Sequence, residues 1–212
     1  MSGADVIPTA VDQAVAAIQG GRAVILPTDT VYGLCASPYR EEPARRVYRL
    51  KGREETTPIA LLCSDLDMLF ECVPELRGKA GRVARSLLPG PYTLVFPNPA
   101  RRYRWLTGSS PDTIGVRVPE LPEPSRLVLD RVGAVLATSA NLPGGAEPRR
   151  PEEVPPQLRD GCDAFLDAGE LPGLPSTVLD LSGPEPKVIR EGAVPAAEAL
   201  ARVHDALAPA SG

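Results

Sequence analysis

Residues 23–34 read AVILPTDTVYGL, an apolar run that changes abruptly into a cluster of polar side chains. The run at 23–26 has no polar residue, which is typical of a strand covered on both faces. Pro27 ends the run, and two threonines, an aspartate and a tyrosine follow within five positions. The stretch is therefore either a polar turn between two elements or one wall of a binding site.

The same succession of a buried strand and small polar or arginine side chains recurs along the chain. Ligands of open α/β sheets bind in the crevice where strands end, so these segments are expected to meet at one pocket. Serine and threonine at strand ends often only cap the next turn, and each segment alone favours that simpler interpretation. The five together favour a pocket. They are PTDT (27–30), TIGVR (113–117), TSAN (138–141), ST (176–177) and VIR (188–190).

Helical and strand patterns alternate through the chain, which indicates one α/β domain (residues 1–212) around a twisted sheet. Short connections between the later strands predict antiparallel pairing toward the C-terminal half. Thr9 and Ser64 are the expected N-caps of the first and third helices. Helices are predicted at 9–21, 41–51, 64–70, 77–88, 125–132 and 196–207, with a shorter one at 156–161. Strands are predicted at 23–26, 58–63, 92–96, 113–119 and 134–141, with shorter ones within 162–169, 176–181 and 187–190. Residues 142–156 read as a loop rich in proline and glycine.

Composition argues against several functional classes. Hydrophobic residues make up 43% of the 212 residues, enough for a sizeable core, and a net charge of −4 disfavours a dedicated nucleic-acid binder. His204 is the single histidine, which nearly rules out a Ser-His-Asp triad or a histidine metal cluster. The four cysteines form no CxxC pair, and we expect reduced, buried thiols. Without a targeting pattern or a membrane-length apolar run, the expected location is cytoplasmic, with no membrane contact.

Positive charges stand at two informative places. Lys51 and Arg53 leave a predicted helix end, where the helix dipole favours cations, but with Thr57 they also suit a phosphate clamp. Arg117 lies inside an apolar strand, where a charge needs either an ion-pair partner or an anionic ligand. The motifs GxxxxGK[ST] and GxGxxG do not occur, so any ATP site is of another type.

The segment ARRYRW (100–105) has two interpretations. Its arginines and aromatic rings suit weak RNA binding by backbone contact and base stacking. They also suit a solvated loop, and a run of charges more often has this simpler meaning.

The ordered series PTDTVYGL, KGR, PIALL, LLPGPYTLV, GVRVP, TSAN, STVLDL and VIREG carries a resemblance. Over residues 8–193 the chain resembles the YrdC-like domain of the L-threonylcarbamoyladenylate synthase family, in its short single-domain form, with a further helix at 196–207. The resemblance implies a twisted open mixed α/β sheet flanked by helices, with a concave basic active-site cavity. It also implies synthesis of threonylcarbamoyl-AMP and pyrophosphate from L-threonine, bicarbonate and ATP with Mg²⁺. Partner proteins would then transfer the threonylcarbamoyl group to tRNA.

The resemblance further implies roles for ten residues. Lys51 and Arg53 would be catalytic. L-Threonine would be bound by Thr30, Arg117 and Ser176. ATP would be bound by Arg53, Thr57, Thr113, Ser139, Asn141 and Arg190. No protein ligand to the metal is predicted.

Three positions depart from the family pattern. Pro143 and Glu147 stand where the family usually carries small hydroxyl residues, and Leu62 replaces a residue that is sometimes polar. Asp29 receives no ligand and is expected to orient its neighbours. The alternatives are a non-catalytic module that binds double-stranded RNA or tRNA, and a transferase that forms carbamoyl-adenylate.

Overall fold

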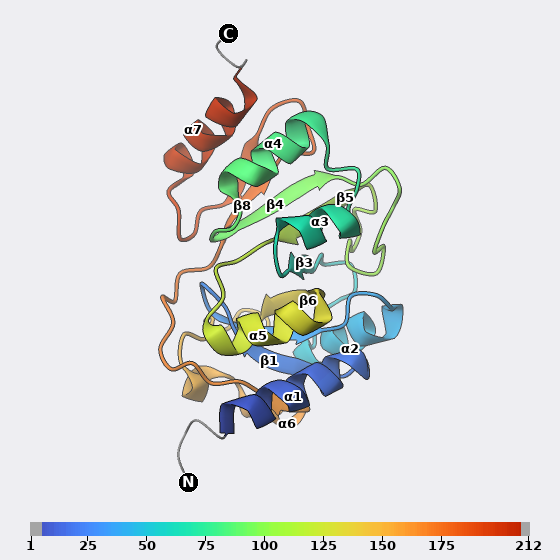
Figure 1. The fold of residues 1–212 in the computed structure, drawn as a ribbon, viewed down its shortest axis with the longest axis vertical. Coiled ribbons are helices and arrows are strands. Elements are labelled where there is room, and N and C mark those ends of the chain that lie inside the picture. Colours follow the sequence, from blue (N-terminus) through green and yellow to red (C-terminus); the bar gives the residue numbers. More distant parts are fainter. Residues whose placement is uncertain (1–5, 209–212) are drawn as a thin grey trace.

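A computed structural model describes residues 6–208 of the chain, with side chains described from residue 10 onward. Its strands are β1 (Val24–Pro27), β2 (Tyr32–Ala36), β3 (Ala60–Cys63), β4 (Tyr92–Pro97), β5 (Thr113–Arg117), β6 (Ala134–Ser139), β7 (Ala164–Phe165), β8 (Thr177–Asp180) and β9 (Lys187–Arg190). They form one nine-stranded sheet in the order β7-β1-β2-β6-β3-β5-β4-β8-β9. The sheet is mixed and flanked by helices, which confirms the predicted fold class (Figure 1).

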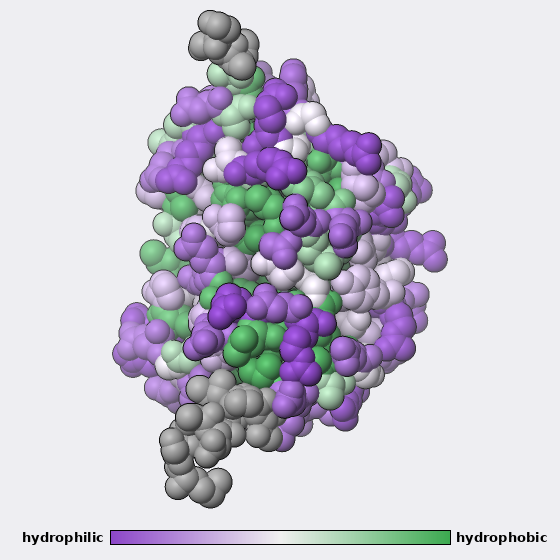
Figure 2. All heavy atoms as spheres, viewed as in Figure 1, coloured by the Kyte–Doolittle hydropathy of each residue, from purple (hydrophilic) through white to green (hydrophobic). Residues whose placement is uncertain are grey.

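Helices lie along the sheet and at both ends of the molecule. They are α1 (Val6–Gln19), α2 (Glu41–Lys51), α3 (Leu66–Cys72), α4 (Gly78–Leu87), α5 (Glu123–Val132), α6 (Pro156–Asp160) and α7 (Ala196–Leu207), with a 3₁₀ turn at Pro151–Glu153. Figure 1 shows α1 and α6 at the end of the molecule near β1, and α4 and α7 at the end near β8. Polar residues cover most of the face in Figure 2, with smaller apolar areas between them. Within residues 6–208, no helix combines the length and apolar character needed to cross a membrane.

The strand β2 is absent from the sequence prediction. Residues 28–31 form a tight turn after β1, and β2 returns antiparallel with Pro27 opposite Tyr32. The side chain of Thr28 fixes this turn, because its Oγ1 donates to the Val31 carbonyl at 2.7 Å and accepts from the Thr30 amide at 3.2 Å. The polar cluster of the opening stretch is therefore the turn of a hairpin between two buried strands.

Two further local predictions, both of helix N-caps, are wrong. The first helix begins at Val6, so Thr9 lies inside it rather than at its N-cap. The N-cap of α3 is Asp65 instead of Ser64, since the Asp65 carboxylate accepts from the Met68 amide at 2.7 Å. The predicted antiparallel pairing toward the C-terminal half is confirmed for β8 and β9, and β1–β2, β2–β6 and β3–β6 are antiparallel as well.

The two faces of the sheet differ, and β5 illustrates how. Ile114 and Val116 are buried in the larger core cluster, which also contains most of the buried apolar residues of α2, α3, α4 and α7. Thr113, Gly115 and Arg117 alternate with them and face the opposite side. On that side a smaller cluster from α1 and α5 packs over β1 and part of β2, β3 and β6. No helix of residues 6–208 covers the rest of this face, mainly over β4, β5 and β8, and a cavity lies there.

Gly192, which follows β9, allows the backbone to pack closely against Pro175 and Ser176, which precede β8. A β-carbon on Gly192 would lie 2.1 Å from the Pro175 carbonyl oxygen and 2.7 Å from the Ser176 carbonyl. Since backbone atoms cannot give way cheaply, Gly192→Ala should lower the free energy of unfolding by about 1–3 kcal/mol. Urea denaturation followed by circular dichroism measures this. Gly183→Ala, where the nearest atom lies 4.0 Å away, is the matched control and should unfold like the wild type. An unchanged midpoint for Gly192→Ala would contradict the packing described.

Candidate active site

The uncovered sheet face holds a cavity of about 920 Å³. Its floor includes mid-strand residues, among them Thr93, Val95, Gly115 and Val178, so it lies across the sheet face and not only at strand ends. All ten sequence-predicted site residues line it: Thr30, Lys51, Arg53, Thr57, Thr113, Arg117, Ser139, Asn141, Ser176 and Arg190. The five polar segments therefore converge on one cavity, as predicted.

Lys51 joins the end of α2 to the segment that follows β6. It is the last residue of α2, and Gly52 turns the chain in the left-handed region with φ of 61°. The Lys51 ammonium donates to Thr138 Oγ1 at 3.2 Å, Asn141 Oδ1 at 3.0 Å and Ser139 Oγ at 3.3 Å, and also to the Ser139 carbonyl. Ser139 Oγ in turn donates to Asn141 Oδ1 at 2.7 Å. One buried cation thus holds the TSAN segment in place.

Burial makes these cations more acidic than usual. Desolvation, with a smaller effect of the Arg53 charge, lowers the pKa of Lys51 to about 8, and Glu147 offsets part of this shift. Burial also lowers the pKa of Arg53, whose guanidinium donates to Thr138 Oγ1 at 3.1 Å and to the Pro58 carbonyl at 3.2 Å. A bound anion would restore the interactions that these groups lose by leaving water.

Arg117 lies at another part of the cavity in a buried ion pair. Its Nη2 is 2.7 Å from Asp29 Oδ1 and 3.4 Å from Thr30 Oγ1, and Thr30 Oγ1 lies 3.0 Å from Thr28 Oγ1. Arg117, a charged residue inside an apolar strand, thus has an ion-pair partner in the protein. Asp29 is not among the residues lining the cavity, whereas Arg117 is. This geometry supports the expectation that Asp29 orients its neighbours.

Burial and the Arg117 charge have opposite effects on the pKa of Asp29. Burial raises the pKa of the Asp29 carboxyl, and the Arg117 charge opposes the shift. Asp29 Oδ2 and Arg117 Nε are buried without a hydrogen-bond partner in the described structure. Breaking a buried pair of this kind leaves an uncompensated charge, so each residue depends on the other for its position.

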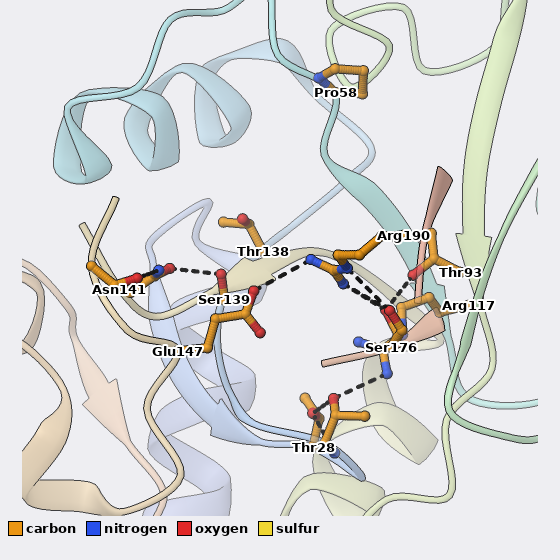
Figure 3. A network of polar contacts seen from close by, with 12 residues as sticks. Thr28, Pro58, Thr93, Arg117, Thr138, Ser139, Asn141, Glu147, Ser176 and Arg190 are labelled. Atoms are coloured by element: carbon orange, nitrogen blue, oxygen red, sulfur yellow. Dashed lines mark hydrogen bonds and ion pairs between the residues drawn. The ribbon is translucent and has the colours of Figure 1, made fainter. Parts of the chain in front are cut away.

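A third polar group lies where β4, β8 and β9 meet. Thr93 Oγ1 and Ser176 Oγ are 2.8 Å apart. Arg190 donates to the Ser176 carbonyl from Nε at 3.2 Å and from Nη2 at 2.9 Å, and its Nη1 is 3.4 Å from Glu147 Oε1. Figure 3 shows Arg190 directed toward Ser176 on one side and Glu147 on the other.

Several lining residues were not assigned from the sequence. They include Thr28, Glu54, Thr93, Thr138, Asp180 and Ser182. The alternation of β4 could have identified Thr93, because Tyr92 and Leu94 are buried in the core and Thr93 must face the other side. Leu62, noted as a departure from the family, is buried in the smaller apolar cluster.

The contacts of ARRYRW (100–105) support a structural role. Arg101 is 2.9 Å from Asp112, and Arg102 is 2.9 Å from Glu75. Trp105 donates from Nε1 to the Pro38 carbonyl at 2.8 Å and packs edge-on against Tyr103. Two of its arginines and both aromatic rings therefore make contacts within the chain.

The chemistry open to this cavity follows from its side chains. Among the described residues, four cations and three carboxylates line it, together with hydroxyl and amide groups, and His204 on α7 is not one of the lining residues. Such a set binds anions and stabilises negative charge that develops in a transition state. Fold and cavity together define an α/β protein with a polar cavity on an open sheet face, whose cations are suited to anionic ligands.

Comparisons with known proteins agree with this class. The family model for Sua5, YciO and YrdC proteins, described as "Telomere recombination", matches residues 16–192. Threonylcarbamoyl-AMP synthase of Pyrococcus abyssi is 32% identical over 182 residues, which are 85% of this chain and 53% of that protein. The synthase of Stenotrophomonas maltophilia is 34% identical over 180 residues, 81% of this chain and 94% of that protein.

A solved structure gives the same result. The crystal structure of P. abyssi Sua5 complexed with L-threonine matches with a TM-score of 0.81 at 31% identity, covering 89% of this chain and 55% of that one. The chain spans about half the length of the P. abyssi protein. It belongs to the Sua5/YciO/YrdC family.

The lowered pKa of Lys51 predicts proton uptake on binding of a polyanion. In the free protein the ammonium loses its proton as the pH rises through about 8. A bound triphosphate would favour the charged form, raise this pKa and draw a proton from the buffer at about pH 8.5. Calorimetry of ATP binding in buffers of different ionisation enthalpy measures the uptake.

Two substitutions sharpen this measurement. Lys51→Arg keeps its charge at this pH and should bind ATP without the Lys51 proton uptake. Lys79→Arg, on the exposed surface of α4, should keep the wild-type uptake. Equal uptake by the wild type and Lys51→Arg would show that Lys51 does not contact the ligand's charge.

Proposed function

We propose that the protein synthesises L-threonylcarbamoyl-AMP from L-threonine, bicarbonate and ATP, with release of pyrophosphate, for the threonylcarbamoyl-adenosine modification of tRNA. One observation carries the proposal. The buried guanidinium of Arg117 lines the same cavity as Lys51, Arg53 and Arg190, so one space offers a receptor for a carboxylate and several for phosphates. The names of the relatives and the threonine complex of Sua5 support this choice of substrates.

The proposed threonine site comprises Thr30, Arg117 and Ser176. Arg117 would hold the substrate carboxylate, because its Asp29 partner fixes the guanidinium from the side away from the cavity. The hydroxyls of Thr30 and Ser176 would bind the polar groups of threonine. The proposed ATP site comprises Arg53, Thr57, Thr113, Ser139, Asn141 and Arg190.

The proposed reaction has two steps. The threonine amine attacks bicarbonate, forms a C–N bond and releases water, which gives a carbamate. A carbamate oxygen then attacks the α-phosphorus of ATP, the bond from this phosphorus to the β-phosphate oxygen breaks, and pyrophosphate leaves. Lys51 and Arg53 would stabilise the charge that develops on the phosphates. Holding the reactants together supplies on the order of 7–11 kcal/mol of barrier lowering in favourable cases.

Mg²⁺ is proposed to accompany ATP, where it would neutralise phosphate charge. Among residues 6–208, no group of three potential metal-binding side chains occurs. The donor set of the cavity therefore fits an ion bound mainly through phosphate oxygens and water, as Mg²⁺ prefers.

A three-substrate assay tests the proposed reaction. Purified protein should release pyrophosphate from ATP only when L-threonine and bicarbonate are both present, and mass spectrometry should detect threonylcarbamoyl-AMP. Pyrophosphate release independent of threonine, or carbamoyl-AMP as the product, would refute the proposal and favour the transferase alternative. Tight, salt-sensitive tRNA binding without any turnover would favour the RNA-binding module.

The role of Arg117 is tested by removing the buried pair. The double variant Asp29→Asn, Arg117→Ala avoids leaving a carboxylate buried alone, and it should raise the Kd for L-threonine by about 10- to 100-fold, as expected for a lost charged hydrogen bond. Asp29→Asn with Arg117 intact separates the two contributions. Arg126→Ala, on the exposed surface of α5, is the control. Calorimetry measures the affinity, and an unchanged Kd for threonine in the double variant would refute the assigned role.

A further inference from the structure

Glu147 is one of three carboxylates that line the cavity, with Glu54 and Asp180, and it forms an ion pair with a cation of the lining. It lies in the loop after β6 and lines the cavity, and its side chain is 24% exposed. Its Oε1 is 3.4 Å from Arg190 Nη1. The loop thereby connects, through one ion pair, to the edge strand β9.

The nitrogen atoms of Arg190 are divided between two partners. Nε and Nη2 donate to Ser176, which holds the guanidinium against the start of β8. Nη1 is directed at Glu147 instead. Nε has one N–H group and Nη2 has two, and these three are directed at Ser176, whereas one of the two N–H groups of Nη1 is directed at Glu147. A phosphate that approaches Arg190 from the cavity would therefore be bound by Nη1, next to the Glu147 carboxylate.

The charge of Glu147 also reaches Lys51. Its proximity raises the Lys51 pKa and so offsets part of the effect of burial. Glu147 therefore interacts with two cations that are proposed to act on ATP, Arg190 as a binding residue and Lys51 as a group that stabilises phosphate charge. In the ligand-free protein its carboxylate contributes some of the negative charge that the nucleotide's phosphates would supply.

We propose that Glu147 is an internal competitor that occupies Arg190 in the free protein and must give way to the triphosphate of ATP. This inference rests on the proposed function, since it takes ATP as the ligand. Glu147 and the phosphates would share the Nη1 nitrogen and the charge of Arg190, and they repel one another, so the carboxylate weakens nucleotide binding. The residue sets the affinity for ATP and takes no part in the chemical step.

The test measures ATP affinity directly and needs no turnover. Glu147→Gln keeps the shape of the side chain and removes its charge. ATP should bind about threefold to tenfold more tightly to this variant, both with Mg²⁺ and with EDTA, given the usual strength of partly exposed ion pairs and like-charge contacts. Glu152→Gln is the matched control, because Glu152 is exposed, lies outside the cavity lining and undergoes the same change of charge. Its ATP affinity should equal that of the wild type.

A double-mutant cycle identifies the partner. In an Arg190→Ala background, Glu147→Gln should give a smaller gain in affinity than in the wild type, because the competition for Arg190 no longer exists. Thermal melts establish that each variant is folded. Unchanged or weaker ATP binding by Glu147→Gln would overturn the inference. Weaker binding confined to Mg²⁺-ATP would instead assign Glu147 to the metal.

The measurement separates this inference from the proposed function. If the wild type binds ATP and Glu147→Gln fails to bind it more tightly, only the role of Glu147 is wrong. If neither protein binds ATP with or without Mg²⁺, the proposed synthase function itself is refuted.

Discussion

The alternation of side chains across a partly covered sheet determines where the polar residues of this protein can lie. On one face, residues such as Leu94 and Val116 pack into a continuous core. On the other face, α1 and α5 cover only the strands near β1. Thr93, which precedes Leu94, and Arg117, which follows Val116, point to this other face and therefore line a cavity. Because strand alternation places these residues, the site is held by the same strands that form the core.

Two buried cations hold loops at the ends of strands in contact with the rest of the site. Lys51 connects α2 to the TSAN segment, and Arg117 connects β5 to the hairpin turn that contains Asp29. Each cation loses hydration by burial, and each recovers part of it through hydrogen bonds to backbone or side-chain oxygens. The turn after β1 and the turn after β6 are thus positioned by electrostatic contacts as well as by their strands.

Much of the fold, and the gathering of the ten candidate residues at one cavity, were predictable from the sequence. The polar segments that follow apolar runs located the cavity, and the motif series gave the family. The strand β2 was missed because Thr28, Asp29 and Thr30 draw attention to the turn and away from the buried residues 32–36 that follow. The N-cap of α3 was misplaced by one position because serine and aspartate are adjacent and equally suited to the role. The ion pairs of Asp29 and Glu147 could not be predicted, since their partners lie 88 and 43 positions away.

The position of Arg190 on β9 has a consequence for local stability. β9 is an edge strand, and its pairing with β8 is interrupted by a register shift between Val178 and Leu179. Edge strands with largely exposed side chains open at a lower free energy than central ones. Arg190 can therefore separate from Ser176 in a partial opening that leaves β4 and β5 folded. Arg117 lies on the inner strand β5, whose opening costs more free energy, so the two ends of the cavity differ in local stability.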